Sequence, residues 1–224
     1  MGIDASIPRG SVALLENNHI LSQQSLDSLP SYSNRLLPLI DRVFSETGTS
    51  LNDVDGFCIT HGPGSFTGLR VGVSLVKGFV LATEKPFMGV DTLEAVASLA
   101  GPVAHPVCAI LDARKKQVYA GFFKFEDGLI TRISTDRAVE PEMLCEEISE
   151  PTLFVGSGLD TYAGLLSAKL GSRFLTGPGT GPNTVAAGAA ILAERRFEEN
   201  KSFDLTQLTI KYVRKSEAEL NFTG

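Results

Sequence analysis

The chain has 224 residues, of which 43% are hydrophobic and 21% are charged, a composition typical of a globular protein with one domain or two compact lobes. Its formal net charge is -6 and it contains no long run of basic residues, which argues against a dominant role in binding polyanions. Cys58, Cys108 and Cys145 lie far apart without metal-ligand spacing, so we expect reduced core cysteines in a cytoplasmic protein, with no secretion signal and no membrane span.

The first part of the sequence predicts a strand, a hairpin and a helix. Residues 1–4 form a short predicted strand, and residues 11–15 and 20–24 are predicted hairpin strands joined by a turn of two asparagines. An apolar pattern of helical period follows over residues 31–47, and residues 51–60 are predicted as the next strand. Strands followed by helices in this order are typical of an α/β lobe.

The most informative stretch lies at residues 61–85, where a Gly-Pro-Gly turn leads into a long apolar segment. Ser65 is a suitable N-cap, so a helix is predicted over residues 65–84. Its apolar positions form two stripes, one of Leu69, Val73, Val76 and Val80 and the other of Gly68, Gly72, Leu75 and Phe79. Each helical glycine costs roughly 1 kcal/mol, and close approach of another backbone is the expected compensation. We therefore expect a helix buried on more than one side, either inside its own lobe or against a second protein.

The order of elements repeats in the second half of the chain. A strand at residues 87–90 and a helix starting at Asp91 complete the first lobe. Ile3-Asp4-Ala5-Ser6 is then echoed by Leu111-Asp112-Ala113-Arg114, and a predicted hairpin follows in both places. The second lobe is predicted to continue with a strand at 129–139, a helix at 141–149, a strand at 152–156, a helix at 159–170, a strand around Phe174 and a helix at 183–197. The repeat predicts two duplicated α/β lobes, residues 1–102 and 103–224, with mixed sheets flanked by helices.

Three glycine-rich loops precede predicted helices, at residues 62–68, 156–158 and 177–182. Backbone N–H groups at a helix start can bind phosphate, but none of these loops has the P-loop or dinucleotide spacing, so ordinary turns are favoured over a nucleotide site. Asp4 and Asp112 end corresponding strands, where an actin-like ATPase would hold Mg²⁺ and water. We favour the interpretation that each aspartate caps the turn that follows it.

No catalytic, cofactor-binding or metal residue is predicted from these patterns. The three histidines are dispersed and lack metal-ligand spacing, and Ser65 has neither the sequence context of a nucleophile nor a paired base. We interpret Ser65 as a helix cap.

The stretch Gly62-Pro63-Gly64-Ser65-Phe66-Thr67-Gly68-Leu69-Arg70-Val71-Gly72 closely resembles the signature of the TsaB (YeaZ) family, whose members are required to form threonylcarbamoyladenosine in tRNA. The resemblance covers essentially the whole chain, including Leu36-Leu37-Pro38-Leu39-Ile40 and Tyr212-Val213-Arg214. It implies a two-lobed actin/hexokinase-like (ASKHA) fold without the ATPase activity of that fold. It also implies two partners, the catalytic paralogue TsaD and the ATPase TsaE.

The resemblance further implies where the partner binds. The helices at residues 31–47 and 65–84 would pack against the equivalent pair of TsaD as a four-helix bundle. The implied interface residues are Leu36, Leu39, Ile40, Val43, Gly68, Leu69, Gly72, Val73, Val76 and Phe79. Without TsaD, the chain is expected to form a homodimer through the same surface, and it is expected to meet tRNA only through the complex. No cofactor is expected on the isolated chain, although the resemblance is compatible with ATP or ADP at the partner interface.

The expected function is that of a non-catalytic scaffolding subunit in the cytoplasm. It would hold TsaD in an active arrangement during transfer of a threonylcarbamoyl group to the adenosine beside the anticodon. The alternative is a stand-alone ATP-dependent small-molecule kinase of the same fold, which would need a complete adenosine-binding motif and paired catalytic carboxylates. Neither feature is evident in the sequence, and a peptidase would lack its nucleophile and base.

Overall fold

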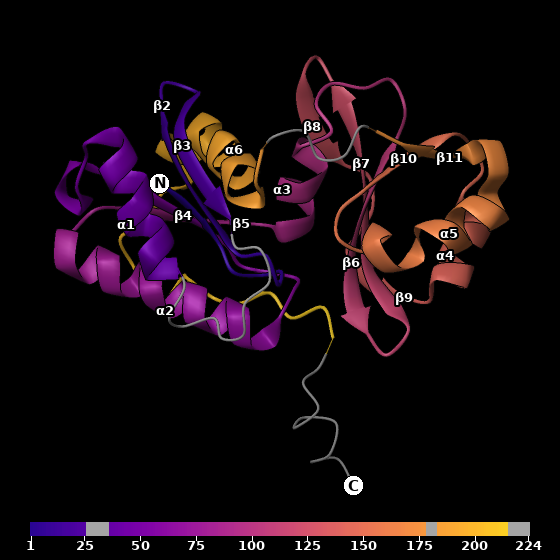
Figure 1. The fold of residues 1–224 in the computed structure, drawn as a ribbon, viewed down its shortest axis with the longest axis horizontal. Coiled ribbons are helices and arrows are strands. Elements are labelled where there is room, and N and C mark those ends of the chain that lie inside the picture. Colours follow the sequence, from indigo (N-terminus) through magenta and orange to yellow (C-terminus); the bar gives the residue numbers. More distant parts are fainter. Residues whose placement is uncertain (26–35, 178–182, 215–224) are drawn as a thin grey trace, which may run out of the picture.

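The computed structural model describes residues 1–25, 36–177 and 183–214, which form two β-sheets flanked by helices (Figure 1). The first sheet has the strand order β3-β2-β1-β4-β5. Its strands are β1 (Gly2–Asp4), β2 (Ser11–Glu16), β3 (His19–Ser25), β4 (Phe57–Thr60) and β5 (Phe87–Val90). Because β1 pairs antiparallel with β2 and parallel with β4, the sheet is mixed.

The second sheet has the strand order β11-β10-β6-β7-β8, and β9 also pairs with β7. Its strands are β6 (Val107–Arg114), β7 (Gln117–Glu126), β8 (Leu129–Arg132), β9 (Arg137–Val139), β10 (Thr152–Val155) and β11 (Phe174–Thr176). Here β6 pairs antiparallel with β7 and parallel with β10, as β1 does with β2 and β4. The two sheets therefore share one strand order and one pattern of directions, which confirms the predicted pair of duplicated α/β lobes.

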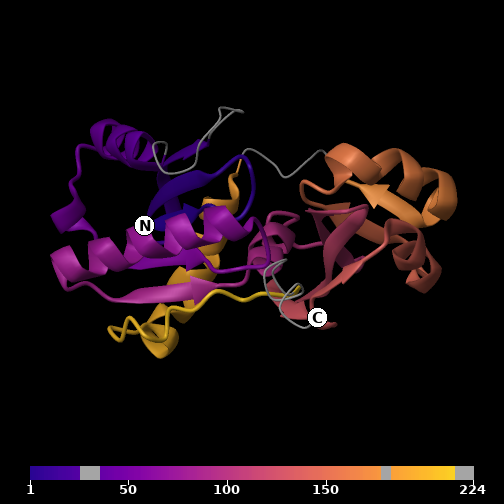
Figure 2. The same cartoon turned by 90° about the horizontal axis from the view of Figure 1, so that it is seen from below.

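Each lobe buries one face of its sheet under its own helices (Figures 1 and 2). The helices of the chain are α1 (Leu36–Thr47), α2 (Phe66–Thr83), α3 (Thr92–Ser98), α4 (Pro141–Glu147), α5 (Leu159–Leu170) and α6 (Val185–Asn200), with short 3-10 turns η1 (Leu51–Asp53) and η2 (Gly171–Arg173). In the first lobe, Val43 of α1 and Val73 of α2 share a core with Ile59 of β4. In the second lobe, Leu144 of α4 and Leu166 of α5 pack with Phe154 of β10.

The helix α2 begins and ends as its sequence predicts. The side-chain oxygen of Ser65 accepts a hydrogen bond from the Gly68 amide at 3.2 Å, which confirms Ser65 as the N-cap. The helix ends at Glu84, which adopts a left-handed backbone conformation with φ 56°, two residues before Pro86. The predicted helix over residues 65–84 thus corresponds to Phe66–Thr83.

The last helix of each lobe covers the sheet of the other lobe. Leu93 and Val96 of α3 pack with Val107 and Phe123 of the second sheet. α6 lies on the first sheet, where a Cβ on Gly2 of β1 would collide with the Ala186 carbonyl oxygen. The prediction that residues 183–197 belong to the second lobe is therefore wrong, because this helix packs on the sheet of the first lobe. The alanine-rich surface of α6 allows this close approach, and a helical pattern in a sequence does not say which sheet the helix will cover.

The segment after α6 also returns to the first lobe. Figure 2 shows residues 201–214 running along this lobe toward the second one. Ser202 forms a β-bridge with Phe87, and Leu208 is buried in the core of the first lobe. Farther along, the Lys211 amide donates a 2.8 Å hydrogen bond to the His61 carbonyl. A division of the chain at residues 102 and 103 therefore does not separate the two lobes in space.

Two predicted strands are shorter than expected, and one predicted helix is described only in part. Residues 51–60 contain η1 before β4. The Ser50 amide and hydroxyl both donate hydrogen bonds to Asp53 Oδ2, and these bonds favour a turn at this point. The predicted strand 129–139 is interrupted at residues 133–136 between β8 and β9. Of the helix predicted at 31–47, residues 36–47 form α1, and residues 31–35 lie outside the described residues.

Candidate functional site

A large cleft of about 1280 Å³ lies between the two lobes. The first lobe contributes the turn between β1 and β2 and the start of α2, and the second contributes the turn between β6 and β7 and the start of α5. The start of α6 and residues 211–214 complete the lining. Because all three glycine-rich loops contribute residues to this lining, the cleft is the feature that could hold a ligand.

The two aspartates that end corresponding strands are held in similar local turns. Asp4 Oδ1 accepts hydrogen bonds from the Ser6 amide at 3.0 Å and from the Ser6 and Thr60 hydroxyls, each at 2.5 Å. Asp112 Oδ1 accepts one from the Arg114 amide at 2.8 Å. Each side chain thus caps the turn that follows it, which confirms the favoured interpretation.

The surroundings of the two carboxylates differ. Asp4 is 0% exposed and does not line the cleft, whereas Asp112 does. Burial raises the pKa of Asp4 above its ordinary value, although the hydrogen bonds from Ser6 and Thr60 oppose this shift. The other oxygen of Asp4, Oδ2, has no partner among the described residues. The structure therefore does not bring the two carboxylates together as a catalytic pair at the cleft.

The first two glycine-rich loops are explained by backbone geometry. Gly62 has φ +129°, and a Cβ there would collide with the Lys211 carbonyl oxygen. Gly156 has φ +106° at the end of β10, and the Gly158 amide donates a 3.0 Å hydrogen bond to the Ile110 carbonyl. The third loop lies mostly outside the described residues, since only Gly177 of residues 177–182 is described.

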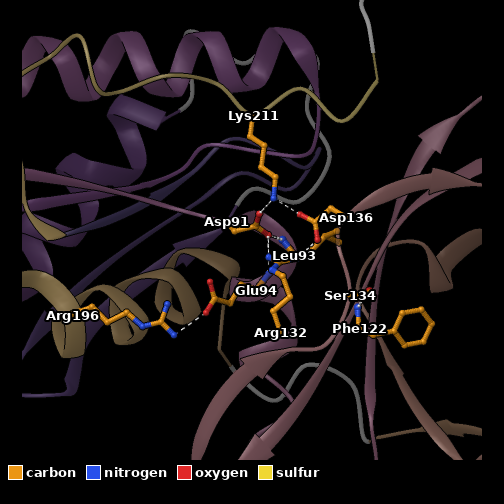
Figure 3. Close-up of polar contacts among 9 residues, drawn as sticks. All are labelled: Asp91, Leu93, Glu94, Phe122, Arg132, Ser134, Asp136, Arg196 and Lys211. Carbon is orange, nitrogen blue, oxygen red and sulfur yellow. Dashed lines mark hydrogen bonds and ion pairs between the residues drawn. The ribbon is translucent and has the colours of Figure 1, made fainter. Parts of the chain in front are cut away.

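An ion-pair network connects both lobes with the C-terminal segment (Figure 3). Lys211 Nζ lies 2.5 Å from Asp91 Oδ2 and 2.6 Å from Asp136 Oδ2. Arg132 contacts Asp91 Oδ1 at 2.8 Å and also pairs with Asp136. Asp91 additionally caps α3 through the amides of Leu93 and Glu94. Two carboxylates and two cations balance in charge, so the arrangement favours a structural link between the lobes over acid–base chemistry.

The residues implied as the partner interface lie mostly inside the first lobe. A Cβ on Gly68 would collide with the Ala5 carbonyl oxygen, and a Cβ on Gly72 would lie 2.9 Å from Ile59 Cδ1. Phe79 is half-buried. The side chains or backbone of the following residues are also buried: Leu36, Leu39, Ile40, Val43, Leu69, Val73 and Val76. Packing inside the lobe therefore explains the glycine stripe without a partner.

A different side of α2 faces away from the sheet. Val71 and Leu75 are half-buried and partly pack against the core of the first lobe, whereas Gly78 and Ala82 are exposed. These four residues, which we call the outer stripe, recur at spacings of four, three and four and so share one helix face. No atom outside the helix backbone and the chain neighbours lies within 4 Å of a Cβ placed on Gly78. The sequence contained this stripe, but its apolar periodicity did not distinguish the outer face from the inner one.

The remaining site hypotheses concern metals, cysteines and membranes. Within the described ranges, no three His, Cys, Asp or Glu side chains gather to hold a metal ion. The three cysteines are buried as predicted, and burial raises the pKa of Cys58 to about 11, so its thiol is unreactive at neutral pH. By length and composition α2 alone among the described helices could cross a membrane, but it packs on the first sheet as a core helix does.

Basic side chains gather at the cleft although they are scattered along the sequence. Arg9, Arg70, Arg114 and Lys115 line it from turns and helix starts of both lobes. Lys211 and Arg214 approach from the C-terminal segment. The cluster is not apparent in the sequence because the chain has no long basic run, and its only local signal is the three consecutive basic residues at 114–116.

Comparison with known proteins shows similarity over nearly the whole chain. Residues 27–221 match the family model described as TsaD, tRNA N6-adenosine threonylcarbamoyltransferase. The chain is 27% identical over 223 residues to the tRNA threonylcarbamoyladenosine biosynthesis protein TsaB of Bacillus subtilis, covering 98% of this chain and 95% of that protein. It is 32% identical over 171 residues to the protein of the same name from Escherichia coli, covering 74% of each.

Solved structures show the same fold. A protein described as similar to peptidase YEAZ from Pseudomonas aeruginosa superimposes with a TM-score of 0.78 at 23% identity, covering 95% of this chain and 97% of that one. The activator of the 2-hydroxyisocaproyl-CoA dehydratase from Clostridium difficile, with bound ADPNP, has a TM-score of 0.52 at 12% identity and covers 96% of this chain and 98% of that one. The two-lobed actin/hexokinase-like fold is thereby confirmed.

Proposed function

Because the chain belongs to the TsaB (YeaZ) family and takes part in tRNA threonylcarbamoyladenosine biosynthesis, we propose that it is the non-catalytic subunit that binds and activates TsaD. The match to the transferase family model supports the proposal that this chain and its catalytic partner are related proteins with the same fold. In this proposal the complex works in the cytoplasm and TsaE joins it. None of the reported relatives favours a stand-alone kinase.

The proposal that this chain is not catalytic is supported by the hydrogen bonds and ion pairs that occupy its carboxylates near the cleft. Asp4 is buried and occupied in capping a turn, and Asp112 caps a turn with a single backbone hydrogen bond. Asp91 and Asp136 are ion-paired with Lys211 and Arg132. A general base needs a free carboxylate within reach of the substrate, and these side chains do not provide a paired site for such chemistry.

The single observation that carries the proposal is the outer stripe of α2. Its residues leave an apolar helix face partly in water, and an exposed helix face of small and apolar residues is suited to close packing with another helix. Leu37 of α1 is 47% exposed and Leu81 of α2 is 71% exposed, which extends the apolar surface of these helices. We propose that TsaD packs on this surface, and that a second copy of the chain occupies it when TsaD is absent.

The experiment places a large charged side chain on the outer stripe. Gly78→Arg is expected to leave the isolated chain folded, because a Cβ at this position meets no neighbouring atoms and glycine is a poor helix former. The same change should weaken binding to TsaD by roughly 10-fold or more and reduce tRNA modification by the mixture of TsaD, TsaE and this chain. Complex mass by light scattering and modified adenosine by mass spectrometry measure both effects.

The matched control is Leu129→Arg on β8. Leu129 is 56% exposed in the second lobe, so this variant adds the same charge to an exposed apolar position away from α2. It should bind TsaD and support modification as the unchanged chain does. Normal complex formation by Gly78→Arg, or catalysis of the transfer by this chain without TsaD, would contradict the proposal.

A further inference from the structure

The charge of the cleft is opposite in sign to the charge of the whole chain. Six basic side chains line it, against the two acidic side chains of Asp112 and Asp160, whereas the chain carries a formal net charge of -6. Lys211 is already neutralised by Asp91 and Asp136. Apart from Lys211, the lining holds five basic side chains against two acidic ones, of which Asp112 pairs with Arg114, so the cleft is a local site of positive potential.

The basic turn between β6 and β7 reaches this cleft with an unusual backbone. Arg114, Lys115 and Lys116 all have positive φ, at 62°, 52° and 59°. Asn17 and Asn18 adopt the same left-handed conformation between β2 and β3, where asparagine is a preferred residue. Long basic residues are disfavoured in this conformation, so their presence indicates a use other than making the turn. The Arg114 side chain is 78% exposed, and its Nη1 lies 4.0 Å from Asp112 Oδ2, an exposed pair that a phosphate could replace.

The positive surface continues onto the first lobe. Arg9 lines the cleft from the turn between β1 and β2, and no ion-pair partner for it occurs in the parts of the chain that the structure describes. Arg70 lines the cleft from α2. Basic groups therefore face the cleft from both lobes, an arrangement that suits a ligand with several phosphates along its length.

Two aromatic rings lie in the lining of the same cleft. The rings of Phe66 and Tyr212 are stacked, with centroids 4.9 Å apart and an angle of 29° between their planes. The guanidinium carbon of Arg70 lies 3.9 Å from the centroid of Phe66. Phe66 is 37% exposed and Tyr212 is 44% exposed, so both rings still offer surface to a ligand. Basic groups combined with exposed stacked rings are typical of sites that bind single-stranded nucleic acid.

We propose that the cleft binds a single-stranded segment of the substrate tRNA, with phosphates on the basic residues and a base on the Phe66–Tyr212 pair. This inference rests on the proposed function, because that function makes tRNA the substrate of the complex. It differs from the sequence-based expectation that the chain meets tRNA only through its partners. The cleft volume of about 1280 Å³ is above the roughly 300–1,000 Å³ of typical small-molecule pockets, so the cleft has room for a ligand larger than a single nucleotide.

The test measures RNA binding by the full chain alone. The probe is a fluorescein-labelled anticodon stem-loop RNA, titrated by fluorescence anisotropy at several salt concentrations. We expect a dissociation constant at or below the order of 10⁻⁴ M at low salt. Removing one basic side chain that contacts a phosphate should weaken binding and reduce the slope of log affinity against log salt by about 0.7 to 1. No detectable binding at roughly 100 μM chain in low salt would overturn the proposal.

The most informative variant is Lys115→Asn. Asparagine tolerates positive φ better than lysine, which offsets the loss of the interaction that the Lys115 side chain makes, so this variant should keep about the same melting temperature while it weakens RNA binding and lowers the salt slope. Lys169→Gln removes one exposed positive charge near the end of α5, outside the cleft lining, and should leave RNA binding unchanged. Equal effects of the two variants on RNA affinity would overturn the proposal, because total charge would then explain the binding.

The aromatic pair has its own test. Tyr212→Ala should weaken RNA binding roughly 5- to 150-fold, the range for losing one stacked base, and Tyr212→Phe should restore most of that loss. Unfolding curves of both variants show whether the segment at residues 209–214 still packs. A Tyr212→Ala chain with the stability and the RNA affinity of the unchanged chain would overturn the role of the ring.

Two further measurements separate this inference from the proposed function. Complex formation with TsaD is measured for Lys115→Asn, and ATP is added as a competitor of RNA. Normal complex formation with reduced RNA binding supports the cleft, whereas failure of the unchanged chain to activate TsaD refutes the proposed function whatever the RNA result. The unchanged chain could instead bind ATP and not the RNA, and Lys115→Asn could abolish that ATP binding. This result would assign the cleft to a nucleotide and overturn the RNA proposal.

Discussion

The two lobes have the same strand order but differ in the chemistry at corresponding positions. Asp4 at the end of β1 is buried and accepts three hydrogen bonds, whereas Asp112 on β6 lies at the cleft and accepts one from the backbone. The turn after Asp4 is long and reaches Ser11, whereas the turn after β6 is tight and carries Lys115 and Lys116. The duplicated topology thus preserves the sheet, while burial and charge have diverged between its copies.

The helices that follow β4 and β10 show the same divergence. α2 brings Gly68 against the backbone of Ala5, just after β1, and Gly72 against the side chain of Ile59 in β4, whereas a Cβ placed on Gly164 of α5 would meet no atoms within 4 Å. α2 therefore uses Gly68 and Gly72 for close packing, whereas α5 tolerates Gly164 without that need. Corresponding positions can be compared by mutation because each lobe provides the control for the other.

The largest difference is expected between Asp4→Ala and Asp112→Ala. Removing the Asp4 carboxylate leaves the Ser6 amide and the Ser6 and Thr60 hydroxyls without their acceptor in a buried site, at a cost of about 3 kcal/mol in the free energy of unfolding. Asp112→Ala loses one exposed turn cap and should cost less than about 1 kcal/mol. Urea unfolding measures both, and equal losses would show that the burial difference between the lobes is not energetically important.

The second largest change in stability is expected from Gly72→Leu in α2 and Gly164→Ala in α5. A side chain at Gly72 would press on Ile59 and Ala5, so we expect a loss of roughly 1–3 kcal/mol in the free energy of unfolding. Gly164→Ala should add up to about 1 kcal/mol, because alanine is the better helix former and the position is open. Scanning calorimetry should show melting temperatures that move in opposite directions. An unchanged melting temperature for Gly72→Leu would mean that this stripe does not pack inside the lobe.

The smallest effect is the pH dependence that comes from Asp4. Burial raises the pKa of Asp4 in the folded chain above 3.8, so the stability from its protonated form is fully present below that pH and is lost as the pH rises through the raised value. The loss is at most about 1.4 kcal/mol per pH unit for one proton. Asp4→Asn cannot ionise and should remove this slope, with Asp112→Asn as the control. A slope that survives in Asp4→Asn would assign it to another group.

Much of the local structure could be predicted from the sequence because it depends on short-range chemistry. The asparagine turn at residues 17–18 and the Ser65 cap of α2 follow from backbone preferences and side-chain hydrogen bonds within a few residues. The aspartate turns after β1 and within β6 are also local. The strand predicted at residues 51–60 was too long, because the reciprocal hydrogen bonds of Ser50 and Asp53 favour a turn over the apolar pattern.

The partner surface shows the limit of a periodic pattern. Periodicity on α2 identified faces that avoid water, and the implied interface combined residues from those faces. In the structure Gly72 and Val73 pack inside the lobe, while the outer stripe from Val71 to Ala82 remains partly in water. A pattern of apolar residues shows that a face is buried, but it does not identify the neighbour that buries it. The docking of TsaD on either face of α2 stays a prediction until binding is measured.

The family motif, the duplicated order of strands and helices, and the caps and turns could all be predicted before folding is considered, because each depends on residues close together in the chain. Three features become visible only in the folded chain: α6 covers the first sheet, one side of α2 remains open, and a chain of net charge -6 has a basic cleft. The physical reason is that packing and electrostatic potential depend on distance in space, and residues as far apart as Arg9, Lys115 and Tyr212 act together only after folding.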